Sequence, residues 1–83
     1  MVRILFFGRL RDAAGGPERV MPLPDGVATA ADLIAFIAAR ETALGAALAD
    51  PTIRIVTDNE VAPRDAPLSG VAEIAFLPPA SGG

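Results

Sequence analysis

The residues of this chain with the clearest chemical potential are the last two, Gly82 and Gly83. They follow an apolar run, Glu73 to Leu77, that is typical of a buried strand, and then Pro78 and Pro79, which would end a strand because proline has no N–H to donate. Glycine has no β-carbon, so a Gly-Gly end passes through a narrow channel and adopts backbone angles that other residues avoid. We therefore predict that the tail carries the carboxylate of Gly83 into the active site of another protein.

The expected division of the chain is a folded domain over residues 1–77 and an extended tail over residues 78–83, which also contains Ala80 and Ser81. Six extended residues, at roughly 3.3–3.6 Å each, span about 20 Å. At average glycine usage, a terminal Gly-Gly arises by chance in about one chain in two hundred. The Gly-Gly end is more informative here because it closely follows a predicted strand and two prolines.

The composition excludes most self-contained catalytic chemistry. All seven cationic side chains are arginine, and the chain contains no cysteine and no histidine. These absences remove disulfides, thiolate nucleophiles, the usual zinc ligands, Schiff-base lysines and the most common general base. We expect no bound metal or cofactor. Reactivity is left to hydroxyl groups, carboxylates and the chain terminus, which points away from a self-sufficient enzyme.

The length and net charge of the chain limit the classes of partner that it can bind. Eighty-three residues make one domain, and the net charge of −3, with arginines scattered from Arg3 to Arg64, argues against a nucleic-acid surface. No apolar run approaches the eighteen residues of a membrane span, and Met1 to Phe7 lacks the features of a secretory signal. We expect no nucleic-acid or membrane partner, and a cytoplasmic location by default.

The first part of the chain predicts two strands. Val2 to Phe7 is rich in strand-forming residues, with Ile4 and Phe6 on one face and Arg3, Leu5 and Phe7 on the other, wetter face. Arg9 to Pro17 contains two glycines and a proline and is expected to be a loop. Arg19 to Leu23 is expected to return as an antiparallel strand near an edge, since prolines flank its end.

The middle of the chain predicts one main helix. Thr29 and Asp32 have the spacing of a capping box, so the helix should start at Ala30. Leu33, Ile34 and Ile37 then give it an apolar face that needs a sheet to cover. A short second helical stretch is expected over Thr42 to Asp50, broken near Gly45 and stopped by Pro51.

The last part predicts a hairpin and the final strand. Ile53 to Thr57 reads as a strand, Asp58-Asn59 as its turn, and Val61 as the start of a short partner. Residues 63–67 are expected to be irregular and residues 68–70 to form a turn. This order of elements favours an α+β fold, a β-grasp in which a mixed sheet packs on one main helix and the first and last strands pair in parallel at the centre.

Two segments together resemble the MoaD/ThiS family of sulfur carriers. They are Leu5 to Asp12, which reads Leu-Phe-Phe-Gly-Arg-Leu-Arg-Asp, and Glu73 to Gly83, which ends Phe-Leu-Pro-Pro-Ala-Ser-Gly-Gly. The likeness extends along the whole chain in element order and is greater to the small subunits of molybdopterin synthase. It implies a ubiquitin-like β-grasp. The turns at Thr57-Asp58-Asn59 and Gly70 to Ile74 depart from the family pattern.

The resemblance also implies a function. The carboxylate of Gly83 would be adenylated by an activating enzyme that uses ATP and magnesium, and a sulfur donor would convert it to a thiocarboxylate. The tail would then enter the large subunit of molybdopterin synthase, in an expected heterotetramer, and give its sulfur to a pterin precursor to build the dithiolene of molybdopterin. Catalytic side chains would belong to the large subunit, so this chain would be a non-catalytic, sulfur-donating subunit.

Residue roles follow from the same resemblance. Gly83 matches the reactive end, Gly82 the second glycine, and Pro78 to Ser81 the part of the tail that threads into the partner. The family places partner contacts at positions that match Phe7, Arg11, Val61 and Leu77. Strand alternation independently puts Phe7 and Leu77 on one face.

Three other functions stay open from the sequence. A ubiquitin-like protein modifier would transfer the same activated glycine to a lysine amine. A carrier of the thiamine pathway would share the sulfur chemistry, although such chains are generally shorter and lack the Arg9-Leu10-Arg11 loop. A plain β-grasp binding module would not need Gly83 at all.

Overall fold

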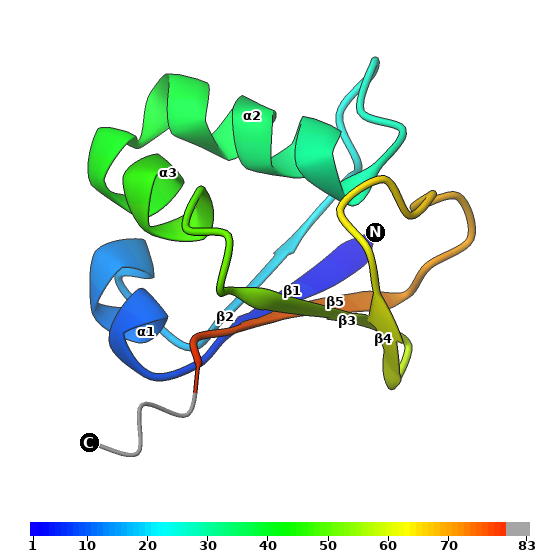
Figure 1. Ribbon diagram of the computed structural model, residues 1–83. Helices are drawn as coiled ribbons and strands as arrows, with labels where there is room; N and C mark the ends of the chain where they lie inside the picture. The colour runs from blue at the N-terminus through cyan, green and yellow to red at the C-terminus, as the bar shows by residue number, and fades with distance from the viewer. Residues whose placement is uncertain (80–83) are drawn as a thin grey trace.

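The central pair of strands, β1 (Val2–Phe6) and β5 (Glu73–Leu77), joins the two ends of the chain. They run parallel with Ile4 opposite Ile74 and Phe6 opposite Phe76. The computed structural model describes residues 1–79, and the sheet in it has the order β2-β1-β5-β3-β4 (Figure 1). The remaining elements are α1 (Arg9–Ala14), β2 (Glu18–Met21), α2 (Ala30–Arg40), α3 (Thr42–Leu48), β3 (Arg54–Thr57) and β4 (Glu60–Ala62).

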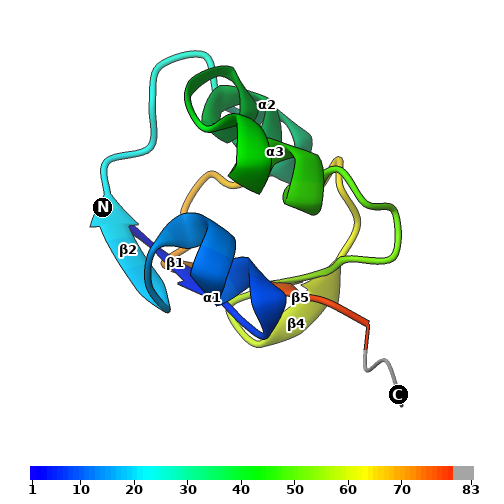
Figure 2. The same ribbon diagram turned by 90° about the vertical axis from the view of Figure 1, so that its left-hand side faces the viewer.

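The two faces of the sheet differ sharply. Helices α2 and α3 lie over one face, and no helix of residues 1–79 covers the other (Figures 1 and 2). This arrangement is the ubiquitin-like β-grasp that the sequence predicted, with β1 and β5 parallel at the centre and β2 at an edge. The uncovered face is therefore available for contact with other molecules.

The core forms where the central strands meet α2. Ile4, Phe6, Ile74 and Phe76 are almost fully buried, and the two phenylalanine rings stack with their centroids 6.0 Å apart. They join the buried face of α2 in one hydrophobic cluster. Each fully buried side chain of this size contributes about 1.5–3 kcal/mol before conformational entropy is counted. The alternation read from the sequence is confirmed.

A capping box sets the start of α2, as predicted. Thr29 Oγ1 accepts a hydrogen bond from the Asp32 N–H at 3.2 Å, and Asp32 Oδ2 accepts from the N–H of Thr29 at 3.0 Å and of Ala28 at 2.9 Å. The backbone donors of Ala28 and Thr29 hold the pKa of the Asp32 carboxyl below its usual range. The exposed N-terminal turn of the helix is thereby satisfied.

The hairpin turn between β3 and β4 also fixes the start of β5. Asp58 and Asn59 have φ angles of 46° and 71°, which allow the tight turn that the sequence predicted. The Asp58 carboxylate accepts from the N–H groups of Ala72, at 3.2 Å, and Glu73, at 3.0 Å. The two departures from the family pattern thus contact each other, with Asp58 in one turn bonding the approach to β5 in the other.

The loop expected over Arg9 to Pro17 is wrong for its first six residues. Residues Arg9–Ala14 form α1, which ends at Gly15 with φ 79°. Leu10 of this helix is fully buried, and the helix packs against α3 at the end of β1. A six-residue helix is too short to be stable alone. Its glycines had indicated a loop, but tertiary packing decides its conformation.

The helix break expected at Gly45 is also wrong. Helix α3 runs unbroken through Gly45, with Leu44 and Leu48 buried on either side. A β-carbon at Gly45 would lie 2.4 Å from Ala38 Cα and 2.5 Å from Ala38 Cβ. Glycine is needed here because α2 and α3 approach each other closely at this point.

We predict that Gly45→Ala destabilises the protein by about 1–3 kcal/mol through overpacking. Helix propensity alone would favour alanine by about 1 kcal/mol, so the sign of the change separates the two effects. Urea unfolding measures it. Ala46→Gly, at the exposed neighbouring position, is the control and should lose stability by propensity only. Increased stability in Gly45→Ala would contradict the close approach of the helices.

Candidate functional site

An apolar row crosses the uncovered face of the sheet. The register places Leu5 beside Ala75, Ala75 beside Val56, and Val56 beside Val61, so the row spans four strands. Leu5 and Val56 are half-buried, while Val61 is 69% exposed. Ala75, expected to be on this face, lies between the larger Leu5 and Val56 and is only 6% exposed. We call these four residues the apolar row.

Two further apolar side chains lie at the end of β1 and β5 from which the tail leaves. Leu77 is half-buried at the last position of β5, opposite Arg54. Phe7 is 43% exposed, and its N–H donates to the Phe76 carbonyl at 3.2 Å, which continues the ladder by one residue. By alternation its side chain falls on the face of Leu5. Large exposed apolar side chains grouped in this way mark interaction surfaces more often than isolated ones do.

Charged side chains lie at the opposite end of the uncovered face, where β1 and β5 begin. Arg3 contacts Glu18 of β2 at 2.8 Å and Glu73 of β5 at 3.5 Å, so one guanidinium bridges three adjacent strands. These ion pairs are exposed and each contributes little stability. Their position matters more, because Arg3 and Glu73 lie at the start of β1 and β5, next to the apolar row. The face is thus polar at one end and apolar toward the tail.

The predicted contact residues divide into two groups. Val61 and Leu77 belong to the uncovered face, and Phe7 lies at its edge. Arg11 is exposed on α1, which packs against α3 at the end of β1, and so is not part of the sheet face. Any partner that contacts all four must therefore extend from the sheet around the end of β1. The role of these residues as contacts stays a prediction.

The tail begins at the end of the sheet where Phe7 and Leu77 lie. Leu77, Pro78 and Pro79 lead away from α2 and α3 in Figure 1, with Pro78 half-buried and Pro79 exposed. The remaining predicted tail residues, including the reactive Gly83, lie outside the described residues: Ala80, Ser81, Gly82 and Gly83. What is described is the base of the tail and the surface beside it.

Sequence reasoning missed an arginine that holds α1 in place beside the tail. Arg19 of β2 binds both carboxylate oxygens of Glu41, at 2.5 and 2.6 Å, and donates to the Ala14 carbonyl at 2.7 Å. Its guanidinium also lies 5.5 Å from the centre of the Phe6 ring. Alternation with Ile4 places Arg19 on the helix side, which was the available signal, but its partner on the α2–α3 junction could not be read from sequence.

The Arg19–Glu41 contact shifts the pKa values of both side chains. The hydrogen bond from Arg19 holds the pKa of the Glu41 carboxyl below its ordinary value of 4.5, and the bond to Glu41 raises the pKa of the Arg19 guanidinium. A second contact ties α1 to the end of α3, because Arg9 lies 3.2 Å from Asp50. The Thr52 hydroxyl and N–H, more than Arg9, lower the pKa of the Asp50 carboxyl.

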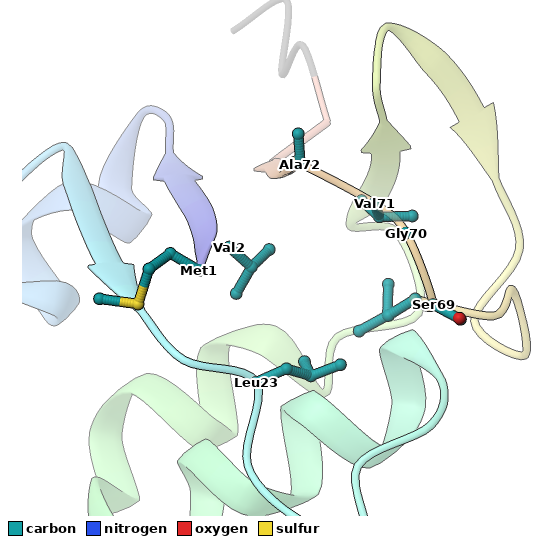
Figure 3. Close-up of a pocket in the computed structure, with 8 residues that line it drawn as sticks. Met1, Val2, Leu23, Ser69, Gly70, Val71 and Ala72 are labelled. Carbon is teal, nitrogen blue, oxygen red and sulfur yellow. The ribbon is translucent and has the colours of Figure 1, made fainter.

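A separate cavity of about 500 Å³ opens at the far end of β1 and β5. Met1, Val2, Leu23 and the segment Leu68–Ala72 line it (Figure 3). Since β1 and β5 are parallel, this cavity lies at the opposite end of the strands from the tail. Its lining is about equally polar and apolar, and none of the residues predicted to be functional lines it.

Within residues 1–79, no group of acidic, cysteine or histidine side chains could hold a metal ion. No helix in this part of the chain is long and apolar enough to cross a membrane. The described residues place the apolar row and Leu77 on the same uncovered face, next to the base of the tail.

The comparisons with known proteins agree with this geometry. The fold defines the class of ubiquitin-like β-grasp proteins. The family model for the ThiS family matches residues 4–83, so the chain belongs to the ThiS family, whose members are MoaD/ThiS-like. No curated protein matches the chain.

Three solved structures share the fold. SAMP1 from Haloferax volcanii is 25% identical, with a TM-score of 0.79 over 99% of this chain and 98% of that chain. A second structure of H. volcanii small archaeal modifier protein 1 is 23% identical, with a TM-score of 0.75 over 95% and 97%. A structure from Pyrococcus furiosus described as molybdopterin converting factor, subunit 1, is 22% identical, with a TM-score of 0.70 over 95% and 97%. The protein is thus a sulfur carrier of the ThiS/MoaD type or a ubiquitin-like small modifier.

We predict that Glu41→Gln loses about 1 kcal/mol of stability at pH 7, as expected for a half-exposed, charge-assisted hydrogen bond. Because folding lowers the pKa of Glu41, its stabilisation is complete above pH 4.5 and is lost as the pH falls through the lowered value. The difference between wild type and variant should shrink below pH 4.5. Urea unfolding from pH 7 to pH 3 measures it, with Glu60→Gln on exposed β4 as control. A constant difference would contradict the pairing.

Proposed function

We propose that this protein is the sulfur-carrier small subunit of a molybdopterin synthase, with the carboxylate of Gly83 as the group that carries sulfur. One observation supports this most directly: the central strand β5 runs straight into the Pro78-Pro79 tail beside an uncovered apolar face. Such a body can dock by its face while the tail reaches a site about 20 Å away. The family match through residue 83 supports the same function.

The proposed chemistry proceeds in two steps on the terminal carboxylate. One carboxylate oxygen attacks the α-phosphate of ATP, which forms a mixed anhydride with AMP and releases pyrophosphate. Sulfide from a sulfur donor then attacks the carbonyl carbon and displaces AMP, so a C–S bond replaces the C–O bond of the anhydride and leaves a thiocarboxylate. ATP and magnesium belong to the activating enzyme, and this chain supplies the acyl group. In the large subunit, the ionised sulfur would attack a carbon of the pterin precursor and displace an oxygen leaving group. Water would then cleave the acyl–sulfur bond, which leaves the sulfur on the pterin and restores the carboxylate.

The composition fits a passive donor. Within residues 1–79 the uncovered face offers aliphatic and aromatic surface, and no cysteine or lysine of this chain competes for the activated carboxyl group. A docked partner would exclude water from the tail by covering Leu77 and Phe7. Hydrolysis of the anhydride would then be slower than attack by sulfur.

A second function has support of its own. The two H. volcanii structures are described as SAMP1 and small archaeal modifier protein 1, and one of them is 25% identical to this chain. A modifier would use the same adenylate and pass the acyl group to a lysine amine of a target, releasing AMP. The two functions therefore separate after adenylation, at the choice of nucleophile.

Intact-mass analysis distinguishes these functions. The protein is incubated with an adenylating enzyme of this family, ATP, magnesium and a sulfur donor. We expect the product mass to show one oxygen replaced by sulfur, and a chain without Gly83 to show no change. Amide-linked conjugates on lysines of other proteins, without such an exchange, would support the modifier. An unchanged mass together with an absence of conjugates would contradict both.

We predict that Leu77→Arg weakens binding to the large subunit about tenfold or more while the fold stays intact. Leu77 is half-buried on the uncovered face, so arginine can extend into solvent in the free protein but would be buried without a counter-charge in the complex. Titration calorimetry and circular dichroism measure the two effects. Val20→Arg is the matched control, because Val20 is 56% exposed at the polar end of the same face. Unfolding of Leu77→Arg would instead place Leu77 in the core.

A further inference from the structure

The paths of β1 and β5 separate at one point, where Gly8 lies next to Pro78. Phe6 is opposite Phe76, and the Phe7 N–H extends the ladder to the Phe76 carbonyl, so two residues later Gly8 lies opposite Pro78. From here β1 turns into α1, while β5 becomes the tail. In Figures 1 and 2 the segment after β1 and the segment after β5 leave this end of the sheet in different directions.

Gly8 makes that turn with a backbone that side chains disfavour. Its φ is 57° and its ψ is −136°, and its carbonyl accepts the Arg11 N–H at 3.1 Å as α1 begins. A β-carbon at this position would lie 2.8 Å from Pro78 Cγ and 3.6 Å from Pro78 Cδ. Real β-carbons do not approach another atom as closely as 2.8 Å, so any side chain at Gly8 would displace the proline ring.

This contact is specific to Gly8 among the glycines of residues 1–79. Gly15, Gly26 and Gly70 also have positive φ angles, of 79°, 85° and 78°, but a β-carbon at any of them would meet nothing within 4 Å. Their conformations serve turns. Gly8 alone combines a positive φ with a contact on the tail.

The displaced ring would redirect the tail and leave the strand in place. Leu77 is held by pairing with Arg54 in the ladder, and the residue before a proline is restricted to extended conformations. The peptide bond before Pro78 is planar and the ring fixes φ of Pro78, so the ring moves mainly by rotation about ψ of Leu77, and this rotation turns the chain that follows. Five further residues extend about 17 Å. A change in the direction of the chain at Pro78 therefore changes the region that the terminal carboxylate can reach.

We propose that Gly8 is a positioning residue, whose lack of a side chain sets the direction in which the tail leaves the docked body. This inference rests on the proposed function, because it concerns how Gly83 reaches the activating enzyme. Docking depends on the uncovered face, which does not include Gly8. Gly8 thus controls the reaction rate of the terminal carboxylate and leaves the affinity of the body unchanged.

The test is Gly8→Ala in the full chain, with an adenylating enzyme of this family and ATP. Calorimetry gives Kd, and single-turnover formation of the adenylate gives the rate. We expect Kd to stay within about threefold and the rate to fall at least about tenfold, since misplacing reacting atoms by about 1 Å costs up to a hundredfold. Gly15→Ala, with positive φ and no contact, controls for backbone strain and should keep the wild-type rate.

A double-mutant cycle with Pro78→Ala separates the contact from the strain. Truncating the ring removes Cγ, so Gly8→Ala should slow adenylation much less in the Pro78→Ala background than in the wild type. Equal losses in both backgrounds, or a wild-type rate for Gly8→Ala, would overturn the inference. If Gly8→Ala folds only in the Pro78→Ala background, the contact between Gly8 and Pro78 is supported. If Gly8→Ala folds in neither background, backbone strain at Gly8 explains the loss of folding and the inference fails. A wild-type protein that is never adenylated would refute the proposed function itself.

Discussion

The parallel pairing of β1 with β5 is the constraint on which the rest of the structure depends. It brings residues seventy positions apart into one ladder and buries Ile4, Phe6, Ile74 and Phe76 beneath α2. Because the strands are parallel, both also end at the same edge of the sheet. That edge is where α1 starts, where the tail leaves and where Phe7 and Leu77 are found. The buried centre of the sheet thus directly anchors the segment that is proposed to react.

Much of this could be predicted from the sequence, because the signals are local. Alternation in β1 and β5, the capping box at Thr29 and the Asp58-Asn59 turn each depend on neighbours in the chain. The errors concern features set by distant contacts. Residues Arg9–Ala14 become a helix because Leu10 is buried against α3, and Gly45 stays helical because Ala38 of α2 lies against it. Glycine content indicated breaks at both places, since sequence alone does not reveal what packs against a glycine.

The candidate site was predictable only in part for the same reason. Strand alternation placed Leu5, Phe7 and Leu77 on the uncovered face, and the register adds Val56 and Val61 to the surface around them. The ion pair between Arg19 and Glu41 was not predictable, because it joins an edge strand to the junction between two helices. The contact of Gly8 with Pro78 also needs the register, as seventy residues separate the two. Local sequence patterns predict which residues form the uncovered face. The contact between Gly8 and Pro78 can be seen only in the folded structure.

The form of the surface fits the proposed function for a physical reason. A carrier must dock on an activating enzyme and later on a large subunit, and its single tail can occupy one active site at a time. Both partners must then use the same edge of the sheet, and each must release the carrier. An apolar row of four small or medium side chains, flanked by exposed ion pairs, supports contacts of the smaller, transient class. A large apolar face would hold the first partner too tightly. We therefore expect moderate affinity, so productive delivery depends on the direction in which the chain leaves β5 at Pro78.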